Sequence, residues 1–198
     1  MFSVEDCREI LDRVRSCSIQ YESQGVRKFL PRLSEDRWLA EFVLSKTQRP
    51  GHQVEIRRDD CWSIVHESSR PLGLHCDNSP NGSYQVLVPL QGAGSTILYS
   101  GRWHEATNFV SEPETIQNAT NNRVVPNFGD SPFDLDSYRE HCSHIDYSLL
   151  TGLSIETVYE WKLGECFEFD RSIVHSAGSL TTQKIGLSIF FDHDKSAA

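Results

Sequence analysis

Two stretches near the N-terminus have the apolar spacing of amphipathic helices. In residues 4–17 the apolar side chains recur every three or four positions, at Cys7, Ile10, Leu11, Val14 and Cys17. This spacing places them on one face of a helix. Ser3 and Asp6 at its start resemble a capping box. A second helix is expected after Ser34 and before Pro50, with one apolar side formed by Trp38, Leu39, Phe42 and Val43. Both apolar faces predict packing against a sheet.

Beyond residue 54 the pattern changes to short segments of alternating or apolar residues, separated by Gly, Pro and Asn. The expected strands are 54–65, 84–90, 95–99, 157–161, 166–169 and 184–191. Several short strands with such turns predict a β sandwich or jelly roll, braced from outside by the N-terminal helices. The expected fold class is therefore mainly β with flanking helices. At 198 residues the chain is expected to form a single domain.

Residues 102–152 interrupt the strand pattern with a long, irregular and polar segment. Its aromatic content favours an ordered lid over a disordered insertion, the aromatic residues being Trp103, Phe109, Phe128, Phe133, Tyr138 and Tyr147. His141 and His144 are three residues apart and could form a metal-binding pair on a helix. No carboxylate or cysteine completes a metal-binding set with them at familiar spacing, so we expect them to be solvated or hydrogen-bonded.

Composition and charge narrow the class of partner and the compartment. The formal net charge of −9 would repel a phosphate backbone, so nucleic acid is not an expected partner. No apolar run approaches the ~20 residues of a membrane span, and the segment 1–9 lacks the basic and apolar regions of a signal peptide. The expected location is the cytoplasm. Six cysteines without a C-x-x-C pair are expected to be reduced and to form neither a disulfide framework nor a zinc site.

Two short segments carry the candidate chemistry, 74–77 (Leu-His-Cys-Asp) and 169–175 (Phe-Asp-Arg-Ser-Ile-Val-His). In a strand, side chains two residues apart project from the same face, so His75 and Asp77 can approach one metal while Cys76 points away. His175 from a distant strand would complete a set of two histidines and one carboxylate. This facial triad leaves about three positions of an octahedral ferrous ion open for a chelating co-substrate and dioxygen. We therefore predict His75, Asp77 and His175 as metal ligands and catalytic residues.

With Lys184, nine positions after His175, these residues resemble the iron(II)- and 2-oxoglutarate-dependent oxygenase family. The resemblance covers residues 54–101 and 155–191, which would form the core, with 1–50 as supporting helices and 102–152 as an insertion or lid. It implies a double-stranded β-helix (a cupin-like jelly roll) that binds Fe(II), 2-oxoglutarate and dioxygen. It also implies hydroxylation of a C–H bond with release of succinate and carbon dioxide. Related halogenases lack the carboxylate ligand, so Asp77 favours hydroxylation, desaturation or another oxidative outcome over halogenation.

The same family places an Arg or Lys after the distal histidine to bind the far carboxylate of 2-oxoglutarate. Lys184 fits this role, and the alternation of residues 184–190 puts Gly186 and Ser188 on its side of the strand. A lysine ammonium is a point charge without the bidentate fork of arginine. The alternative is a solvent-exposed lysine at a strand edge. Candidate pocket-lining residues on the strands after the metal pair are Tyr84, Gln85, Thr96 and Leu98. Alternation predicts two faces of these strands without indicating which of them points inward. Tyr84 is assigned to co-substrate binding, whereas Trp62 and Trp161 are expected in the core.

The leading hypothesis is an oxygenase acting on a small molecule or an amino-acid side chain, and the acidic charge admits a cationic substrate. A peptidyl hydroxylase of the same family is an alternative, which an open groove would favour. A cupin-like metalloenzyme could use the same three ligands without 2-oxoglutarate. A catalytically silent binding module remains a third class, against which the intact set of His75, Asp77, His175 and Lys184 argues.

Overall fold

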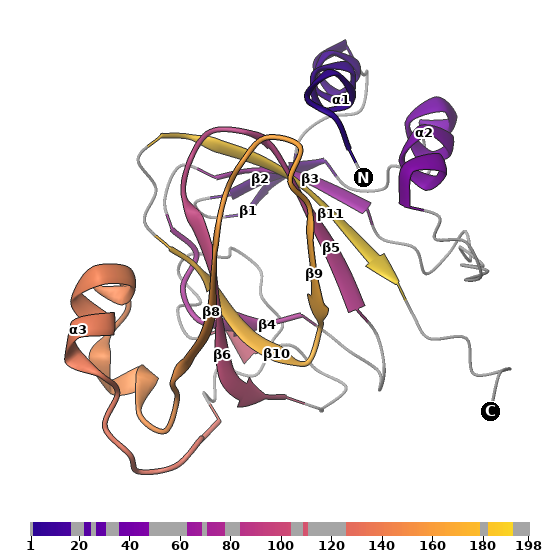
Figure 1. Cartoon of the computed structure of the whole chain (residues 1–198). Helices are drawn as coiled ribbons and strands as arrows, with labels where there is room; N and C mark the ends of the chain where they lie inside the picture. The colour runs from indigo at the N-terminus through magenta and orange to yellow at the C-terminus, as the bar shows by residue number, and fades with distance from the viewer. Residues whose placement is uncertain are drawn as a thin grey trace, which may run out of the picture.

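The strands form two antiparallel sheets (Figure 1). The computed structural model describes residues 2–16, 22–24, 27–30, 36–47, 63–68, 71–77, 84–103, 109–110, 126–178 and 182–191. One sheet has six strands, in the order β1 (Glu22–Gln24), β2 (Arg27–Leu30), β3 (Ser63–Ser68), β11 (Lys184–Phe191), β5 (Tyr84–Gln91) and β9 (Phe167–Asp170). The other has five, in the order β7 (Phe109–Val110), β4 (His75–Cys76), β10 (Ile173–Ala177), β6 (Ser95–Arg102) and β8 (Ile155–Glu160). This arrangement confirms the mainly β jelly roll with flanking helices that the sequence predicts.

Most of the expected strands are present with boundaries shifted by a few residues. Strands β5, β6, β8, β9 and β11 correspond to the alternating or apolar segments of the sequence. The first expected strand, 54–65, overlaps β3 only from residue 63, and its earlier part lies outside the described residues. Strands β1, β2 and β7 have no counterpart among the strands expected from the sequence.

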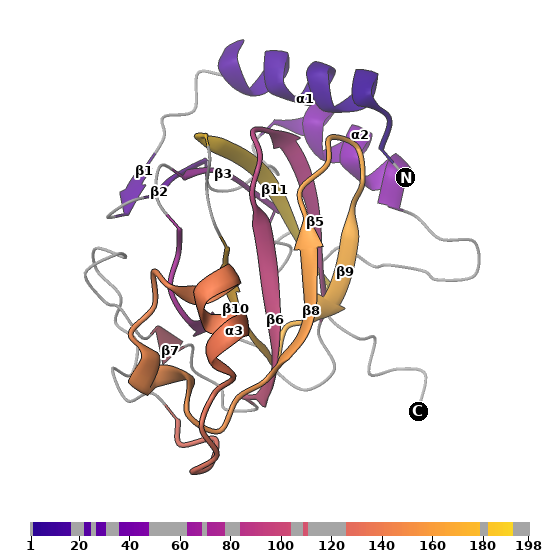
Figure 2. The ribbon, with the colours of Figure 1, turned by 60° about the vertical axis from the view of Figure 1, so that its left-hand side comes forward.

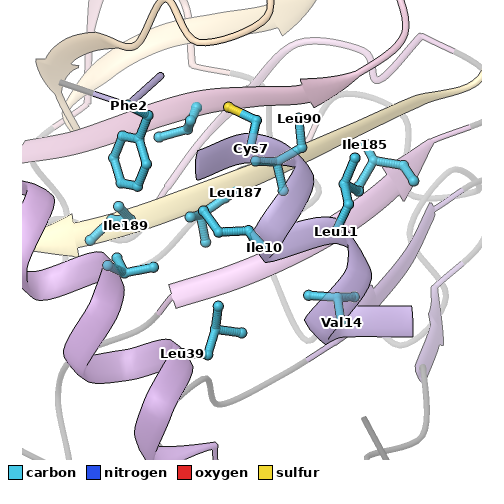
Figure 3. Packing of buried hydrophobic residues seen from close by; sticks show 12 residues of the cluster. Phe2, Cys7, Ile10, Leu11, Val14, Leu39, Leu90, Ile185, Leu187 and Ile189 are labelled. Carbon is cyan, nitrogen blue, oxygen red and sulfur yellow. The ribbon is translucent and has the colours of Figure 1, made fainter. Parts of the chain in front are cut away.

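Both predicted helices are present and cover the outer face of the six-stranded sheet (Figure 2). They are α1 (Val4–Ser16) and α2 (Arg37–Thr47). The capping box forms as predicted, since the Asp6 amide donates to Ser3 Oγ (3.1 Å) and the Ser3 amide donates to the Asp6 carboxylate (2.7 Å). Figure 3 shows the cluster that joins both helices to β5 and β11, which includes Ile10, Leu11, Val14, Leu39, Leu90, Ile185, Leu187 and Ile189.

Two ion pairs link the helices to each other. Arg13 Nε lies 2.7 Å from an Asp36 carboxylate oxygen, and Lys46 Nζ lies 2.9 Å from one of Asp6. Both carboxylates also accept hydrogen bonds at the start of a helix, from the Leu39 amide in the case of Asp36. Each acid therefore caps one helix and pairs with a base on the other, which fixes the two helices on the sheet as a unit.

Two further clusters lie on either side of the five-stranded sheet. Between the sheets, the cluster consists of Leu87, Leu98, Trp161, Phe167, Phe169 and Ile173. On the outer face, a second cluster joins strands β4, β6 and β10 to the segment 126–153 and includes Leu74, Tyr99, Phe133, Cys142, Ile145, Leu150 and Val174. Strands β4, β6 and β10 of the five-stranded sheet are consequently covered on both faces, whereas β8 at its edge remains partly exposed.

The described part of the long insertion is ordered. It contains the short helix α3 (Leu135–Ser137), a π-helical turn (Tyr138–Cys142) and a 3-10 turn (Tyr147–Leu150). Figures 1 and 2 show this segment on the side of the protein away from α1 and α2. Its aromatic residues pack behind the five-stranded sheet, with the Tyr147 hydroxyl donating to the Phe133 carbonyl at 2.6 Å. Residues 104–108 and 111–125, on which the expectation of a lid also depends, lie outside the described residues.

Candidate metal centre

The strand register brings the two distant histidines together. Strands β4 and β10 are antiparallel neighbours in which His75 pairs directly with His175. Their imidazole rings are 4.1 Å apart between centroids. Asp77 follows His75 by two residues, and its carboxylate lies 3.5 Å from Nε2 of His175. One potential ligand atom from each of the three residues lies within 4.8 Å of the others, which is a spacing that one metal ion can bridge.

Backbone carbonyls hold both imidazole rings in the same manner. Nδ1 of His75 is 2.8 Å from the Gly73 carbonyl oxygen, and Nδ1 of His175 is 2.8 Å from the Ile173 carbonyl oxygen. A carbonyl only accepts, so Nδ1 must carry the proton in each ring. The lone pair of each neutral imidazole is then on Nε2. A hydrogen bond of this kind on the second nitrogen is typical of metal-binding histidines.

The third ligand is ionised. Burial by itself would raise the pKa of the Asp77 carboxyl, but the hydrogen bond and positive charge that His175 supplies when its ring is protonated outweigh it, with smaller contributions from His75 and Arg171. The net effect lowers the pKa of Asp77 below its ordinary value. An ionised carboxylate and two neutral imidazoles are the donor set of a non-haem ferrous site, although manganese, cobalt and zinc accept the same donors.

Cys76 lies between two of the ligands but points away from them. Its side chain belongs to the outer cluster, and its thiol donates to the Arg171 carbonyl at 3.1 Å. Burial raises the pKa of the Cys76 thiol well above its usual range, which keeps it protonated. The alternation expected from the sequence, with His75 and Asp77 on one side and Cys76 on the other, is therefore present.

A cavity between the sheets contains all three ligands. Its volume is about 90 Å³, several times the roughly 10–15 Å³ that one water requires. The lining residues come from both sheets and are Leu72, His75, Asp77, Gln85, Leu87, Thr96, Trp161, Phe169, His175, Ser176, Ala177, Lys184, Ser188 and Phe190. The cavity can thus hold a small molecule next to the ligand group.

Lys184 is enclosed at this cavity, with only 2% of its surface exposed. Its ammonium donates to the Ser95 carbonyl at 3.3 Å and lies 4.0 Å from the centre of the Trp161 ring, whose indole N–H donates to Thr96. Within the described part of the chain no carboxylate forms an ion pair with Lys184. Burial lowers the pKa of Lys184 to about 7. This environment differs from that of a solvent-exposed lysine at a strand edge.

A tight turn holds the first residue of β11 in place. Gly92, between β5 and β6, has a φ of +91°, and a Cβ at this position would overlap the Gln183 carbonyl and the Lys184 backbone. Only glycine combines this conformation with such close approach. The turn therefore fixes the backbone from which the Lys184 side chain enters the cavity.

The other residues expected at the site divide between two faces. Ser188 lies in the cavity lining, as does Gln85. Tyr84 does not, because it lies on the opposite face of β5, packed against the cluster beneath the helices. Alternation along a strand separates two sets of residues, and here the inward set begins with Gln85. Trp161, expected only as a core residue, is buried and also lines the cavity.

Several lining residues were not singled out from the sequence. Phe169 contacts the His175 ring edge-on, with centroids 5.0 Å apart, and pairs with Gln85 across β5 and β9. Phe190 pairs with Gln85 from the other side, across β5 and β11. Phe190 could have been identified from the sequence, because it follows Ser188 by two residues in the alternating β11 segment.

His141 and His144 lie outside the metal-ligand group found among the described residues. His141 Nε2 is 3.6 Å from the Glu140 carboxylate. His144 is largely enclosed behind the five-stranded sheet, where burial lowers its pKa despite a backbone hydrogen bond with Ala177. The sequence-based expectation is that both residues are solvated or hydrogen-bonded; the Nε2 atom of His144 is instead buried without a hydrogen-bond partner among the described residues.

Comparison with known proteins reveals similarity in structure but not in sequence. No protein-family profile matches the chain, and no curated protein is significantly similar to it. The non-heme alpha ketoglutarate dependent epimerase SnoN from nogalamycin biosynthesis superposes with a TM-score of 0.55 at 14% identity, covering 96% of this chain and 75% of SnoN. KdgF from Halomonas sp. gives a TM-score of 0.39 at 9% identity over 90% of this chain and 91% of that protein. The described helices include none long and apolar enough to cross a membrane. Together, the two sheets and the likeness to SnoN show that the chain has the double-stranded β-helix fold.

Proposed function

We propose that the protein is a non-haem Fe(II)- and 2-oxoglutarate-dependent dioxygenase. Its reaction is the hydroxylation of an unactivated C–H bond in a small molecule or an amino-acid side chain, with formation of succinate and carbon dioxide. The observation that carries the proposal is that the His75, Asp77 and His175 group lines the same cavity as a buried Lys184, which forms no ion pair with any carboxylate of the described residues. The fold shared with SnoN is compatible with this function.

The argument for a dicarboxylate depends on the cost of burying a charge. A lysine enclosed without an acidic partner is unfavourable in the ligand-free protein, and the lowered pKa of Lys184 reflects that cost. An anionic ligand that reaches Lys184 would offset it. A keto acid whose opposite end chelates a metal at the triad meets both requirements within one cavity.

The residues of this chain would divide the work of binding and positioning. His75, Asp77 and His175 would hold the ferrous ion, which when bound supplies the open coordination positions and the electrons for dioxygen activation. Lys184 would bind the far carboxylate of 2-oxoglutarate, with the Ser188 hydroxyl as a second donor. Trp161 positions the ammonium through its ring. The apolar lining residues, among them Leu87 and Phe169, exclude water from the reacting atoms.

An anaerobic titration tests the proposal. Fe(II) and then 2-oxoglutarate are added to the metal-free protein, and the visible charge-transfer band of the chelate is recorded. We expect a band in the wild type, loss of iron binding in Asp77→Ala, and at least about tenfold weaker 2-oxoglutarate binding in Lys184→Met, which removes a charge-assisted hydrogen bond. Lys162→Met is the matched control, since Lys162 is exposed and pairs with Glu165.

The outcomes separate the alternative functions. Iron binding without a band would contradict the use of 2-oxoglutarate and favour a cupin-like metalloenzyme. No iron binding would leave a jelly-roll binding module. Equal 2-oxoglutarate affinity in Lys184→Met and Lys162→Met would remove Lys184 from the co-substrate site. If the band forms, succinate release stimulated by peptides but not by small molecules would favour the peptidyl hydroxylase.

A further inference from the structure

Gln85 has a buried carboxamide oxygen that no described residue satisfies. The residue is 3% exposed, it lines the cavity, and its Oε1 has no hydrogen-bond partner in the described part of the chain. Buried polar atoms of this kind are rare in folded proteins, because each costs free energy unless something donates to it. An unsatisfied acceptor on a residue that lines a cavity is explained by a ligand with a hydrogen-bond donor that displaces the neighbouring side chains enough to reach it.

Gln85 and Lys184 join the cavity lining from strand positions that are far apart. On β11, Phe190 pairs with Gln85 and follows Lys184 by six residues, which separates the two backbone positions by about 20 Å along a strand. The contacts of the two residues place the candidate metal ligands between them. The Lys184 ammonium contacts β6 at Ser95, and β10 crosses β6 three residues further on, at His175.

Phe169 then links the metal ligands to Gln85. Its ring contacts that of His175, and its backbone pairs with that of Gln85. In the proposed function, 2-oxoglutarate occupies the part of the cavity between the metal and Lys184. The part between the metal and Gln85 is thereby left for the molecule to be oxidised.

We infer that this second part of the cavity binds a small neutral substrate with an apolar body and one O–H or N–H group, which donates to Gln85 Oε1. This inference rests on the proposed function, because that function assigns the Lys184 end to the co-substrate. The apolar body is indicated by the residues beside Gln85, which are Phe169 on one side and Phe190 on the other. The donor is indicated by the unsatisfied oxygen.

The substrate is neutral because the lining offers no charge to pair with a cation. Among the described lining residues Asp77 is the only carboxylate, and in this site it binds the metal. A neutral amide oxygen does not compensate the desolvation of a buried ammonium group. This narrows the sequence-based hypothesis, which admitted a cationic substrate on the basis of the overall acidic charge.

Matched pairs of small aromatic probes test the inference. Each pair differs only in the donor: phenol and anisole, indole and 1-methylindole, benzyl alcohol and benzyl methyl ether. Dissociation constants are measured by ligand-observed NMR on the protein loaded with Zn(II), which is diamagnetic, and 2-oxoglutarate. We expect the wild type to bind each donor about tenfold more tightly than its methylated partner, as one buried hydrogen bond provides.

Three variants assign that preference to Gln85. Gln85→Met keeps the side-chain length without the amide, and the preference should fall to within about twofold. Gln85→Glu keeps an acceptor and should retain a preference for donors. Gln91→Met is the matched control, because Gln91 is at the exposed end of the same strand, bound to Arg15, and should behave as the wild type.

Several results would overturn the inference. They are the absence of binding by any probe, equal affinity within each pair in the wild type, and a donor preference that survives in Gln85→Met. Tighter binding of benzylamine than of benzyl alcohol would overturn the assignment of a neutral substrate.

Failure of the proposed function gives a different pattern. The charge-transfer band would then be absent, while metal-free protein would still bind the donors with a preference that depends on Gln85. Conversely, a normal band together with no donor preference would contradict the inference and leave the proposed function intact.

Discussion

Lys184→Met tests whether the cavity contains a lysine whose charge is destabilising. Burial lowers the pKa of Lys184 to about 7 in the folded protein, compared with 10.5 for a solvated lysine. The difference of about 3.5 (10.5 minus 7) corresponds to about 5 kcal/mol between the fully charged and fully neutral states. At pH 7 and below, the folded protein bears most of this cost. Replacing the ammonium with the apolar chain of methionine should therefore increase stability.

The sign of the pH dependence follows from proton binding. Between the two pKa values the unfolded chain retains a proton that the folded protein has released, so the free energy of unfolding rises with pH. Because burial lowers the pKa of Lys184 to about 7, this group alone should raise the free energy of unfolding by about 2 kcal/mol between pH 7 and pH 9. Lys184→Met lacks this contribution. Its stability advantage over the wild type should accordingly shrink by about 2 kcal/mol across that range.

Urea denaturation of metal-free protein at pH 7, 8 and 9 measures this difference. The comparison between variants cancels the titration of groups that do not interact with Lys184. His144 is an exception, because the nearby charge of Lys184 contributes to its lowered pKa. Lys162→Met is the control for loss of a lysine at the surface. Parallel stability curves for the wild type and Lys184→Met, or a lower stability of Lys184→Met at pH 7, would refute the reasoning.

Three further predictions concern residues around the cavity and in the core, each measured by urea denaturation at pH 7. Gln85→Met should increase the free energy of unfolding by about 1–2 kcal/mol because it removes an unsatisfied buried amide oxygen. A decrease would contradict this and mean that the Gln85 side chain stabilises the folded protein. Tyr99→Phe should lower it by about 1–2 kcal/mol, since the buried hydroxyl contacts Ser176 Oγ at 2.9 Å and Cys142 Sγ at 3.3 Å, and unchanged stability would contradict this. Leu187→Ala should cost about 2–5 kcal/mol because Leu187 is fully buried beneath α1, whereas exposed Leu163→Ala should change stability by less than about 0.5 kcal/mol.

The strands that the sequence predicts correctly are those in which period-two alternation or an apolar run extends over several residues. Strands β1 and β2 consist of Glu-Ser-Gln and Arg-Lys-Phe-Leu, which lack such a pattern; β1 is the edge strand of the six-stranded sheet, and β2 is its neighbour. Edge strands tolerate polar and charged residues. Strand β10 has no alternation either, because every residue from Ile173 to Ala177 is buried. Only its histidine drew attention to it.

The candidate site could be anticipated only as far as local geometry determines it. The separation of His75 and Asp77 from Cys76 follows from the period of a strand. The direct pairing of His75 with His175 depends on the register of strands about 100 residues apart, which tertiary packing sets. Tertiary packing also explains why Gln85 lines the cavity and Tyr84, which was predicted there, does not. Alternation identifies two faces of β5, but the helices that cover one of them decide which face is inward.

Strand β10 connects the cavity to the rear of the protein. His175 points toward His75 and Asp77, whereas its neighbours Val174 and Ser176 contact the cluster formed with residues 126–153. A substitution in that rear segment that shifts the strand by a fraction of an ångström would displace the His175 ring without altering a residue that lines the cavity. Under the proposed function, such changes would alter metal affinity and reaction rate independently of substrate choice. Selection for activity alone would then yield changes behind the sheet as well as within the cavity.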